Sequence, residues 1–255
     1  MELICDQSVA AAYTSPAQRA RVISEFWFAR NSYCLACAAE RLIRTTANTV
    51  ATDFTCGDCG HRYELKTFSR RPSRSLVDGA YGSLMERVRS GTAPTLCLLE
   101  RSEFWHIQSL TAIHSSFLTP WVIEQRRPLA QSARRAGWVG CNIRLDRIPI
   151  DGEIAVIGVG VPYPKSSVRS RFQRFLPLAK LSATQRGWTT LTLSVIRRLG
   201  ISQFSLGELY LREDEFSAVY PENRHVRAKI RQQLQNLRDL GVLAFEGNGE
   251  YRLLV

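Results

Sequence analysis

Four cysteines constrain the fold of this chain most strongly, because they form two C-x-x-C pairs with 18 residues between the pairs. The pairs are Cys34 with Cys37 and Cys56 with Cys59. This spacing is typical of closed, tetrahedral Zn²⁺ sites with four thiolate ligands. We therefore expect a structural zinc site that fixes the chain between residues 34 and 59. His61 is an alternative ligand, although a polar surface histidine is the simpler interpretation.

The length of 255 residues predicts a larger and a smaller domain. No run of about 18 apolar residues occurs, which argues against a membrane-spanning helix. Glu2 and Asp6 stand where a signal peptide would have basic residues before an apolar stretch. We expect a cytoplasmic protein that is neither exported by this route nor membrane-bound, so a disulfide framework is not expected either.

The charge balance favours a polyanionic partner. The chain has 34 basic and 23 acidic residues, a net charge of +11, and four of the basic residues are lysines. Arginine suits planar, bidentate contacts to phosphate and guanine. No acidic residue occurs between Glu153 and Glu208, although several basic residues do. Clustered positive charge is typical of nucleic-acid binding, and the alternative is a generally basic, solvated surface.

The first part of the chain mixes helical and strand patterns. Apolar residues at helical spacing after a Ser-Pro start predict a helix over residues 15–30. Residues 78–91 predict a second helix that ends at Gly91. Strand patterns cover residues 49–56, 61–68, 94–101, 104–110 and 153–161. The first two strands flank the Gly-rich turn of the second cysteine pair and are expected to form a hairpin. No regular βαβ repeat is present, so we expect an α/β or α+β domain around a mixed sheet.

The C-terminal part predicts a winged helix-turn-helix. Residues 162–187 are rich in Pro, Ser and Arg and are expected to form a linker. Helices are predicted over 188–200, 204–211 and 223–241, the last with Asn223 as N-cap and Gly241 beyond its end. Residues 242–255 predict two strands around a Gly-Asn-Gly turn. Three helices followed by a hairpin are typical of this DNA-binding module.

The apolar residues of the last predicted helix form one stripe with spacings of four, four and three residues. Such a stripe faces a core. Its members are Val226, Ile230, Leu234 and Leu237.

A catalytic pattern lies within the second cysteine segment, where Asp53 is followed by Glu64-Leu65-Lys66. In a strand, residues two apart project from the same face, so Glu64 and Lys66 point together. If Asp53 lies across the hairpin, two carboxylates and one ammonium group converge. Two carboxylates with open coordination positions suit Mg²⁺, and Lys66 would orient or deprotonate the attacking water. The pattern predicts phosphodiester hydrolysis, and the alternative is a set of solvated charges at a strand edge.

Several longer blocks resemble a known enzyme family along nearly the whole chain. They are SYCLAC, the ELK that follows the second cysteine pair, DGAY, QRRPLA and ARRAGWVGCNI within residues 125–143, RGWT at 186–189 and KIRQQLQNLRD at 229–239. The chain resembles the DpnI-like, methyladenine-dependent (type IIM) restriction endonucleases. The resemblance implies a zinc-containing PD-(D/E)XK nuclease domain followed by a winged helix. It also implies Mg²⁺-dependent cleavage of double-stranded DNA at GATC sites that contain 6-methyladenine.

The resemblance also implies roles for individual residues. Asp53 and Glu64 match the metal-binding acids, Lys66 matches the catalytic lysine, and the four cysteines match the zinc ligands. The winged helix is implied as a second reader of the methylated site. Its candidate phosphate or guanine contacts are Arg224, Arg227, Lys229 and Arg231, and its candidate base readers are Gln232, Gln233 and Gln235. The alternative for these residues is an exposed polar helix face. Glu246 and Glu250 in the wing should repel phosphate.

The requirement for methylation suggests an apolar reader. A methyl on the adenine amine spoils the usual bidentate Asn or Gln contact in the major groove. Burial of that methyl against an apolar or aromatic group contributes about 1 kcal/mol. Trp138 is our hypothesis for a wedge or methyl reader, because it lies in a basic loop with Arg134 and Arg135. A buried core tryptophan is the alternative.

Together these patterns predict an endonuclease domain over residues 1–180 and a winged-helix domain over residues 181–255. The predicted cofactors are catalytic Mg²⁺ and structural Zn²⁺, the partner is adenine-methylated duplex DNA, and we expect a monomer. The alternative is a DNA-binding regulator with a zinc knuckle and a winged helix but without cleavage activity. A related nuclease with a different recognition sequence is a third possibility.

Overall fold

The fold is described from a computed structural model that covers residues 1–46 and 52–254. The chain packs as two units, and each unit is assembled from three separate segments. The first unit contains Met1–Pro72, Ala93–Ser115 and Glu153–Leu176, and the second contains Ser73–Thr92, Ser116–Gly152 and Pro177–Val255. Among the described residues, no helix combines the length and apolar character needed to cross a bilayer. The predicted division into residues 1–180 and 181–255 stays a prediction.

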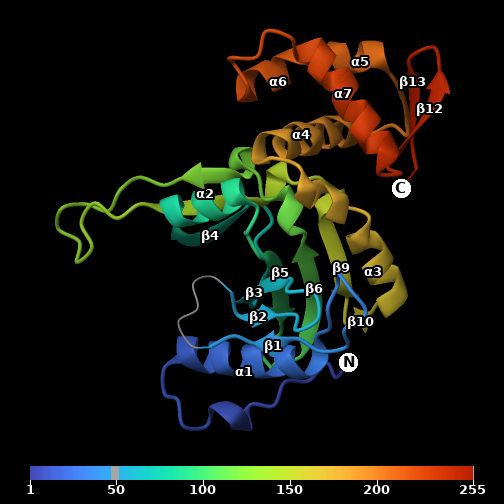
Figure 1. The fold of residues 1–255 in the computed structure, drawn as a ribbon. Coiled ribbons are helices and arrows are strands. Elements are labelled where there is room, and N and C mark those ends of the chain that lie inside the picture. Colours follow the sequence, from blue (N-terminus) through green and yellow to red (C-terminus); the bar gives the residue numbers. More distant parts are fainter. Residues whose placement is uncertain (47–51, 255) are drawn as a thin grey trace. The chain divides into compact units, whose positions relative to one another are not determined.

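The first unit is built on a mixed sheet (Figure 1). Its order, for residues 1–46 and 52–254, is β1-β2-β3-β5-β6-β9-β10. The strands are β1 (Ile43–Arg44), β2 (Phe54–Thr55), β3 (Arg62–Phe68), β5 (Thr95–Arg101), β6 (Ile107–Ile113), β9 (Glu153–Gly158) and β10 (Val161–Pro162). β3 and β5 pair in parallel, whereas the other neighbours are antiparallel. The predicted mixed α/β fold is therefore confirmed.

The β2–β3 hairpin matches the expected pairing around the second cysteine pair. Phe54 pairs with Tyr63 and Thr55 pairs with Arg62 in an antiparallel register. The strand predicted over residues 49–56 is shorter than expected in its described part, because only Phe54–Thr55 is regular strand. Residues 49–51 of that prediction lie outside the described residues.

α1 (Pro16–Asn31) covers one face of this sheet, as the apolar spacing predicted. Its residues Ile23, Trp27 and Phe28 are buried in the core of the first unit. Phe28 meets Phe54 of β2 with ring centroids 4.8 Å apart. The helix thereby fixes the hairpin that carries Asp53.

α3 (Lys165–Gln173) overturns the prediction of a linker over residues 162–187. Two of its residues, Val168 and Phe172, lie four apart and are 1% and 0% exposed in the first unit. This pair anchors the helix, because residues four apart lie on the same helix face. The Ser- and Arg-rich composition that suggested a linker belongs to the other faces. A short 3₁₀ helix, η6 (Leu176–Lys180), follows.

The second unit contains a smaller sheet of order β4-β8-β7, formed by β4 (Ser75–Ala80), β8 (Gly140–Arg144) and β7 (Ile123–Gln125). α2 (Tyr81–Ser90) follows β4 and ends at Gly91, whose φ of 73° is left-handed, as predicted. The helix starts later than the predicted residue 78, because residues 78–80 belong to β4. The connection between β7 and β8 projects away from the sheet (Figure 1).

The C-terminal helices of the second unit are α4 (Ala183–Leu199), α5 (Leu206–Tyr210), α6 (Glu213–Val219) and α7 (Val226–Asp239). α6 is an addition to the three predicted helices. The predicted N-cap Asn223 is wrong: α7 begins at Val226 after His225, and the Oδ1 of Asn223 accepts a hydrogen bond from the His225 backbone N–H (2.8 Å). The predicted stripe of α7 is buried, with Val226 the most exposed member at 5%.

The predicted C-terminal hairpin is present as β12 (Leu243–Gly247) and β13 (Glu250–Leu253). A further strand, β11 (Gln203–Ser205), pairs with β13 on the other side. α5 follows β11 directly, and Ser205 and Glu208 form a capping box at its start. The hairpin and the helices therefore form one small helical domain.

Candidate functional site

Asp53 lies beside the E-x-K pair of β3. The backbone N–H of Asp53 donates to the carbonyl of Tyr63 (3.0 Å), and the backbone N–H of Leu65 donates to Oδ2 of Asp53 (2.8 Å). Nζ of Lys66 lies 2.6 Å from Oε1 of Glu64. The side chain of Glu64 is 10% exposed and that of Lys66 is 23% exposed. The structure thus brings two carboxylates and one ammonium group to one hairpin.

The strand geometry separates this charged face from the core. Tyr63 and Leu65 alternate with Glu64 and Lys66 along β3, so the two sets point to opposite faces. Tyr63 is buried in the core under α1, and Leu65 packs against that core. Burial of the odd-numbered residues fixes the register, because a slip by one residue would turn the acid and the lysine into the core.

Glu25 of α1 is a further acidic group close to Asp53 that the sequence patterns did not identify. It is 8% exposed, it pairs with Arg44 of β1, and Arg21 lies 3.7 Å from its other oxygen. Burial raises the pKa of Glu25; the charges of Arg44 and Arg21 oppose this shift, and the charge of Asp53 adds to it. The sequence signal for Glu25 is an acidic residue within the apolar face of the first helix.

The four predicted zinc ligands form one cluster. Their sulfur atoms all lie within 4.8 Å of one another. Cys34 Sγ lies 3.6 Å from Cys59 Sγ, and Cys37 Sγ lies 3.5 Å from Cys56 Sγ. A tetrahedron with Zn–S bonds of about 2.3 Å has sulfurs about 3.8 Å apart, so the four thiols fit a Zn²⁺ ion.

The turn of the second pair favours the thiolate form of its first cysteine. Burial opposes ionisation of Cys56, but hydrogen bonds from the backbone N–H groups of Cys59 and Asp58 lower its pKa below the usual value. Hydrogen bonds to a thiolate stabilise the charged form. Since thiolates are the form that binds metal, this turn is suited to a ligand.

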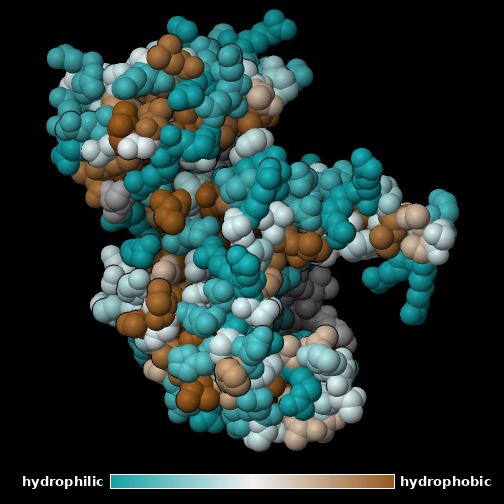
Figure 2. Space-filling model, turned by 180° about the vertical axis from the view of Figure 1, so that it is seen from behind, coloured by the Kyte–Doolittle hydropathy of each residue, from teal (hydrophilic) through white to brown (hydrophobic). Residues whose placement is uncertain are grey.

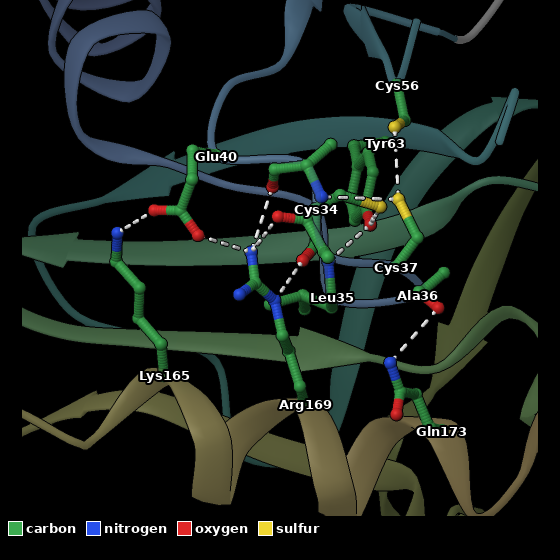
Figure 3. Close-up of polar contacts among 12 residues, drawn as sticks. Cys34, Leu35, Ala36, Cys37, Glu40, Cys56, Tyr63, Lys165, Arg169 and Gln173 are labelled. Carbon is green, nitrogen blue, oxygen red and sulfur yellow. Dashed lines mark hydrogen bonds and ion pairs between the residues drawn. The ribbon is translucent and has the colours of Figure 1, made fainter. Parts of the chain in front are cut away.

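Tyr63 connects the cysteine cluster to β3 (Figure 3). Its hydroxyl lies 3.3 Å from Cys34 Sγ and accepts a hydrogen bond from the backbone N–H of Leu35 (2.9 Å). Glu64 is the next residue along the strand and points to the opposite face. The cluster and the charged face therefore share one strand.

His61 is not the surface residue that was expected. Its Nε2 lies 2.8 Å from Thr95 Oγ1, and its ring packs against Tyr63 and Phe172. Burial lowers the pKa of His61 to about 4. The imidazole is therefore neutral, and its Nε2 is engaged with Thr95 and not with the cysteine cluster.

The connection between β7 and β8 carries the predicted loop residues. Arg134 and Arg135 are exposed, and Trp138 is half-buried, which argues against the alternative of a buried core tryptophan. The indole folds over Gly140: a Cβ at that position would lie 2.8 Å from the ring of Trp138. The projecting segment carries both hydrophilic and hydrophobic side chains (Figure 2). It presents an aromatic group among basic side chains.

The predicted readers of the C-terminal domain divide into exposed and buried residues. Arg224, Arg227, Arg231 and Gln232 are exposed, and Lys229 is half-buried. Gln233 is 2% exposed, and its Oε1 accepts hydrogen bonds from Thr189 Oγ1 (2.8 Å) and Asn236 Nδ2 (3.0 Å). Its prediction as a base reader is corrected, because the side chain joins α7 to α4 inside the domain.

Two ion pairs modify the charge of this domain. Arg227 Nε lies 2.7 Å from Glu213 Oε2, and in the β12–β13 hairpin Arg252 Nε lies 2.8 Å from Glu246 Oε1. Both pairs are exposed enough to contribute little stability. The repulsion expected from Glu246 is partly offset by Arg252.

Two family models match the chain, and together they cover nearly all of it. The model of the Dam-replacing family DpnI matches residues 1–181. The model of the Dam-replacing HTH domain, DpnI_C, matches residues 184–253. The second match implies DNA binding by the C-terminal domain. The chain therefore belongs to the DpnI, or Dam-replacing, family, and this membership implies a methyl-dependent restriction endonuclease.

Proposed function

We propose that this protein is a Mg²⁺-dependent, type IIM endonuclease that cleaves duplex DNA at GATC sites containing 6-methyladenine. The proposal rests above all on the hydrogen bond from the Leu65 backbone N–H to Asp53 Oδ2 (2.8 Å), which holds Asp53 beside Glu64 and Lys66. Family membership supports the reaction class. We further propose that the part up to residue 180 is a PD-(D/E)XK nuclease domain and that residues 181–255 form a winged helix. The limits of the two family matches support this division.

In this proposal Asp53 and Glu64 hold the metal, and they fit Mg²⁺ because it takes one or two carboxylates and fills its other positions with water and phosphate oxygens. Mg²⁺ bound there would act as a Lewis acid on the scissile phosphate. Lys66 orients the attacking water and stabilises negative charge on the phosphate oxygens. Its contact with Glu64 at 2.6 Å keeps the ammonium group beside the metal-binding carboxylate.

The cysteine cluster binds structural Zn²⁺ in this proposal. Cys56 and Cys59 lie in the turn between Asp53 and β3, and Cys34 and Cys37 complete the set. Bound zinc would therefore fix the turn that joins the two catalytic segments. Metal binding of this kind contributes about 10 to 16 kcal/mol in small zinc modules.

Recognition of DNA is assigned to both parts of the chain. Arg134, Arg135 and Trp138 serve the nuclease domain, with Trp138 as the wedge or methyl reader. Arg224, Arg227, Lys229, Arg231 and Gln232 serve the winged helix through phosphate or base contacts. Two reading modules in one chain allow a monomer to act.

The test compares the wild-type protein with Asp53→Asn on plasmids that are adenine-methylated or unmethylated, with and without Mg²⁺. We expect the wild-type protein to cut only the methylated plasmid and only with Mg²⁺. Asp53→Asn should bind the methylated plasmid in a gel-shift measurement without cutting it. Mapping of the cut sites then tests the GATC assignment.

Two outcomes would contradict the proposal in different ways. Wild-type protein that shifts methylated DNA but never cuts it would indicate the non-catalytic regulator. Cleavage at methylated sites other than GATC would retain the nuclease but replace its recognition sequence.

A further inference from the structure

α3 holds the first cysteine arm by polar contacts to its backbone (Figure 3). The arm, residues 34–40, carries Cys34 and Cys37. Arg169, Gln173 and Lys165 of α3 all reach it. The remaining two cysteines belong to the β2–β3 turn, so the first arm has a different support.

Arg169 makes most of these contacts. Its Nε donates to the carbonyl of Cys34 (3.0 Å), and its Nη2 lies 2.9 Å from the carbonyl of Ala39, 3.2 Å from that of Ala38 and 3.0 Å from Oε1 of Glu40. The side chain is 17% exposed; its bonds to the carbonyls of Cys34 and Ala39 are partly buried, whereas those to Ala38 and Glu40 are exposed. One guanidinium group therefore spans both ends of the arm.

The chemistry of arginine suits this position. A guanidinium group has five N–H donors in a rigid fork, whereas an ammonium group is a compact donor on a flexible stem. The backbone carbonyls of the arm need donors, and the fork supplies them to Cys34, Ala38 and Ala39. Four thiolates around Zn²⁺ also carry a net charge of −2, which the positive charge of Arg169 offsets in part.

The polar contacts of Arg169 can be removed without removing the apolar contacts that pack α3 into the first unit. Val168 and Phe172 bury the helix through apolar packing, and this packing remains when the guanidinium group is removed. Arg169 also lies over the ring of Tyr33, 5.0 Å from its centroid. Loss of the side chain should therefore loosen the arm more than the helix.

We propose that Arg169 is a positioning residue for the metal centre: it holds the Cys34–Cys37 arm in the geometry that binds Zn²⁺. It does not ligate the metal. The inference rests on the proposed zinc site and not on DNA cleavage. Residues that orient metal ligands typically change metal affinity by about 10- to 100-fold when they are replaced.

The experiment measures zinc in the full-length protein by metal analysis and zinc affinity by competition with a chromogenic chelator. Arg169→Ala should raise the apparent dissociation constant by about 10- to 100-fold. Arg169→Lys keeps the charge but not the fork, so it should fall between the alanine variant and wild type. Arg171→Ala removes an exposed arginine from the same helix and should leave the affinity unchanged.

Glu40→Gln separates the carbonyl contacts from the ion pairs. Glu40 pairs with both Lys165 and Arg169, but its replacement leaves the three carbonyl contacts in place. We expect a smaller loss of affinity than in Arg169→Ala. An equal loss would overturn the assignment of the effect to the carbonyls.

A spectroscopic measurement distinguishes positioning from general destabilisation. Co²⁺ in place of Zn²⁺ reports the ligand geometry by its visible absorption. The spectrum should change in Arg169→Ala at a temperature where the near-ultraviolet circular dichroism is that of wild type. If Arg169→Ala does not fold, the same comparison with Arg169→Lys decides: weaker binding supports the inference and unchanged binding overturns it.

The outcomes also separate this inference from the zinc proposal. Wild-type protein without bound zinc would refute the zinc site itself. Wild-type protein with one zinc ion, and an Arg169→Ala variant with the same affinity and the same Co²⁺ spectrum, would refute the role of Arg169 alone.

Discussion

At the scale of single residues, consecutive side chains of β3 serve different environments. Tyr63 reaches the cysteine cluster, Glu64 and Lys66 form the charged face, and Leu65 packs against the core between them. Each of these contacts depends on successive side chains of the strand pointing to opposite faces. Substitutions on the two faces should therefore have different consequences.

Lys66→Ala should reduce cleavage of methylated DNA by at least about 10²- to 10³-fold, because removal of one charge-stabilising group has this effect in enzymes. The fold should persist, since Lys66 lies on the charged face and not in the core. Single-turnover cleavage and a gel shift with methylated DNA measure the two effects. Thr67→Ala, on the same strand but the opposite face, is the matched control, and an equal loss of cleavage there would contradict the assignment.

His114 should make stability depend on pH. Burial lowers the pKa of His114 to about 3, with a smaller contribution from the charge of His61. Since the folded-state pKa lies below the unfolded value of 6.5, the contribution to stability is complete above pH 6.5 and is lost as the pH falls toward 3. Between these values it changes by up to about 1.4 kcal/mol per pH unit.

Urea unfolding of wild type and His114→Phe, measured from pH 7 down to pH 5, checks this expectation. The variant should show a shallower fall in the free energy of unfolding. His106→Gln, which changes an exposed histidine of the same unit, is the control. Identical slopes for wild type and His114→Phe would contradict the assignment.

At the scale of elements, α7 has an inner face that packs the domain and an outer face that we propose contacts DNA. Its inner face carries Leu234, which is 0% exposed, and its outer face carries Arg231, whose Nη1 donates to the hydroxyl of Tyr210 (2.7 Å). The inner face packs the domain, and the outer face is available to a phosphate. The two faces can therefore be tested independently.

Leu234→Ala should lower the free energy of unfolding by about 2 to 5 kcal/mol, the usual cost of truncating a buried leucine. Arg231→Ala should change stability by less than about 0.5 kcal/mol. It should weaken binding to methylated DNA and reduce the slope of log affinity against log salt by about 0.9, as expected for one lost phosphate contact. An unchanged salt slope would remove Arg231 from the set of phosphate contacts.

The elements also show which structural features a sequence can predict. α1 and α7 follow from repeated apolar residues and from Pro16 and Gly241 at their ends. α3 was missed because only Val168 and Phe172 anchor it, and two apolar residues do not make a visible period.

Prediction of the site residues has the same limit: local patterns are visible in the sequence, and contacts between distant residues are not. The zinc spacing and the D…E-x-K spacing are local patterns, and the structure brings both sets of residues together. The burial of Gln233 and the pairing of Glu25 with Arg44 depend on residues far apart in sequence. Thr189 and Gln233 are 44 positions apart, so no local pattern joins them.

At the scale of the whole molecule, the proposed Mg²⁺ and Zn²⁺ ions would have different roles. The proposed Mg²⁺ site has two carboxylates, one of them nearly buried, whereas the cysteine cluster joins two cysteine pairs within the Met1–Pro72 segment of the first unit. In the proposed function, the first metal would be needed for the reaction and the second for the fold.

Removal of each metal should separate these roles. Chelation of Mg²⁺ should stop cleavage at once, and addition of Mg²⁺ should restore it fully without a change in the unfolding midpoint. Removal of Zn²⁺ should lower the thermal midpoint and abolish cleavage, and Cys59→Ala should do the same. A zinc-free or Cys59→Ala protein that keeps both its midpoint and its activity would contradict a structural role for the cluster.

The shared strand limits how this protein can be modified by exchange of segments. Tyr63 and Glu64 are adjacent in sequence, so their Cα atoms are only about 3.8 Å apart. A chimera that took the cysteine arms from another protein would change the contacts that hold the Tyr63 side chain. A shift of Tyr63 would also displace Glu64, the next residue of the strand. A transplantable module would have to run from Cys34 through Lys66 and bring α3 with it. The cysteine cluster and the proposed catalytic strand β3 should therefore be inherited as one unit.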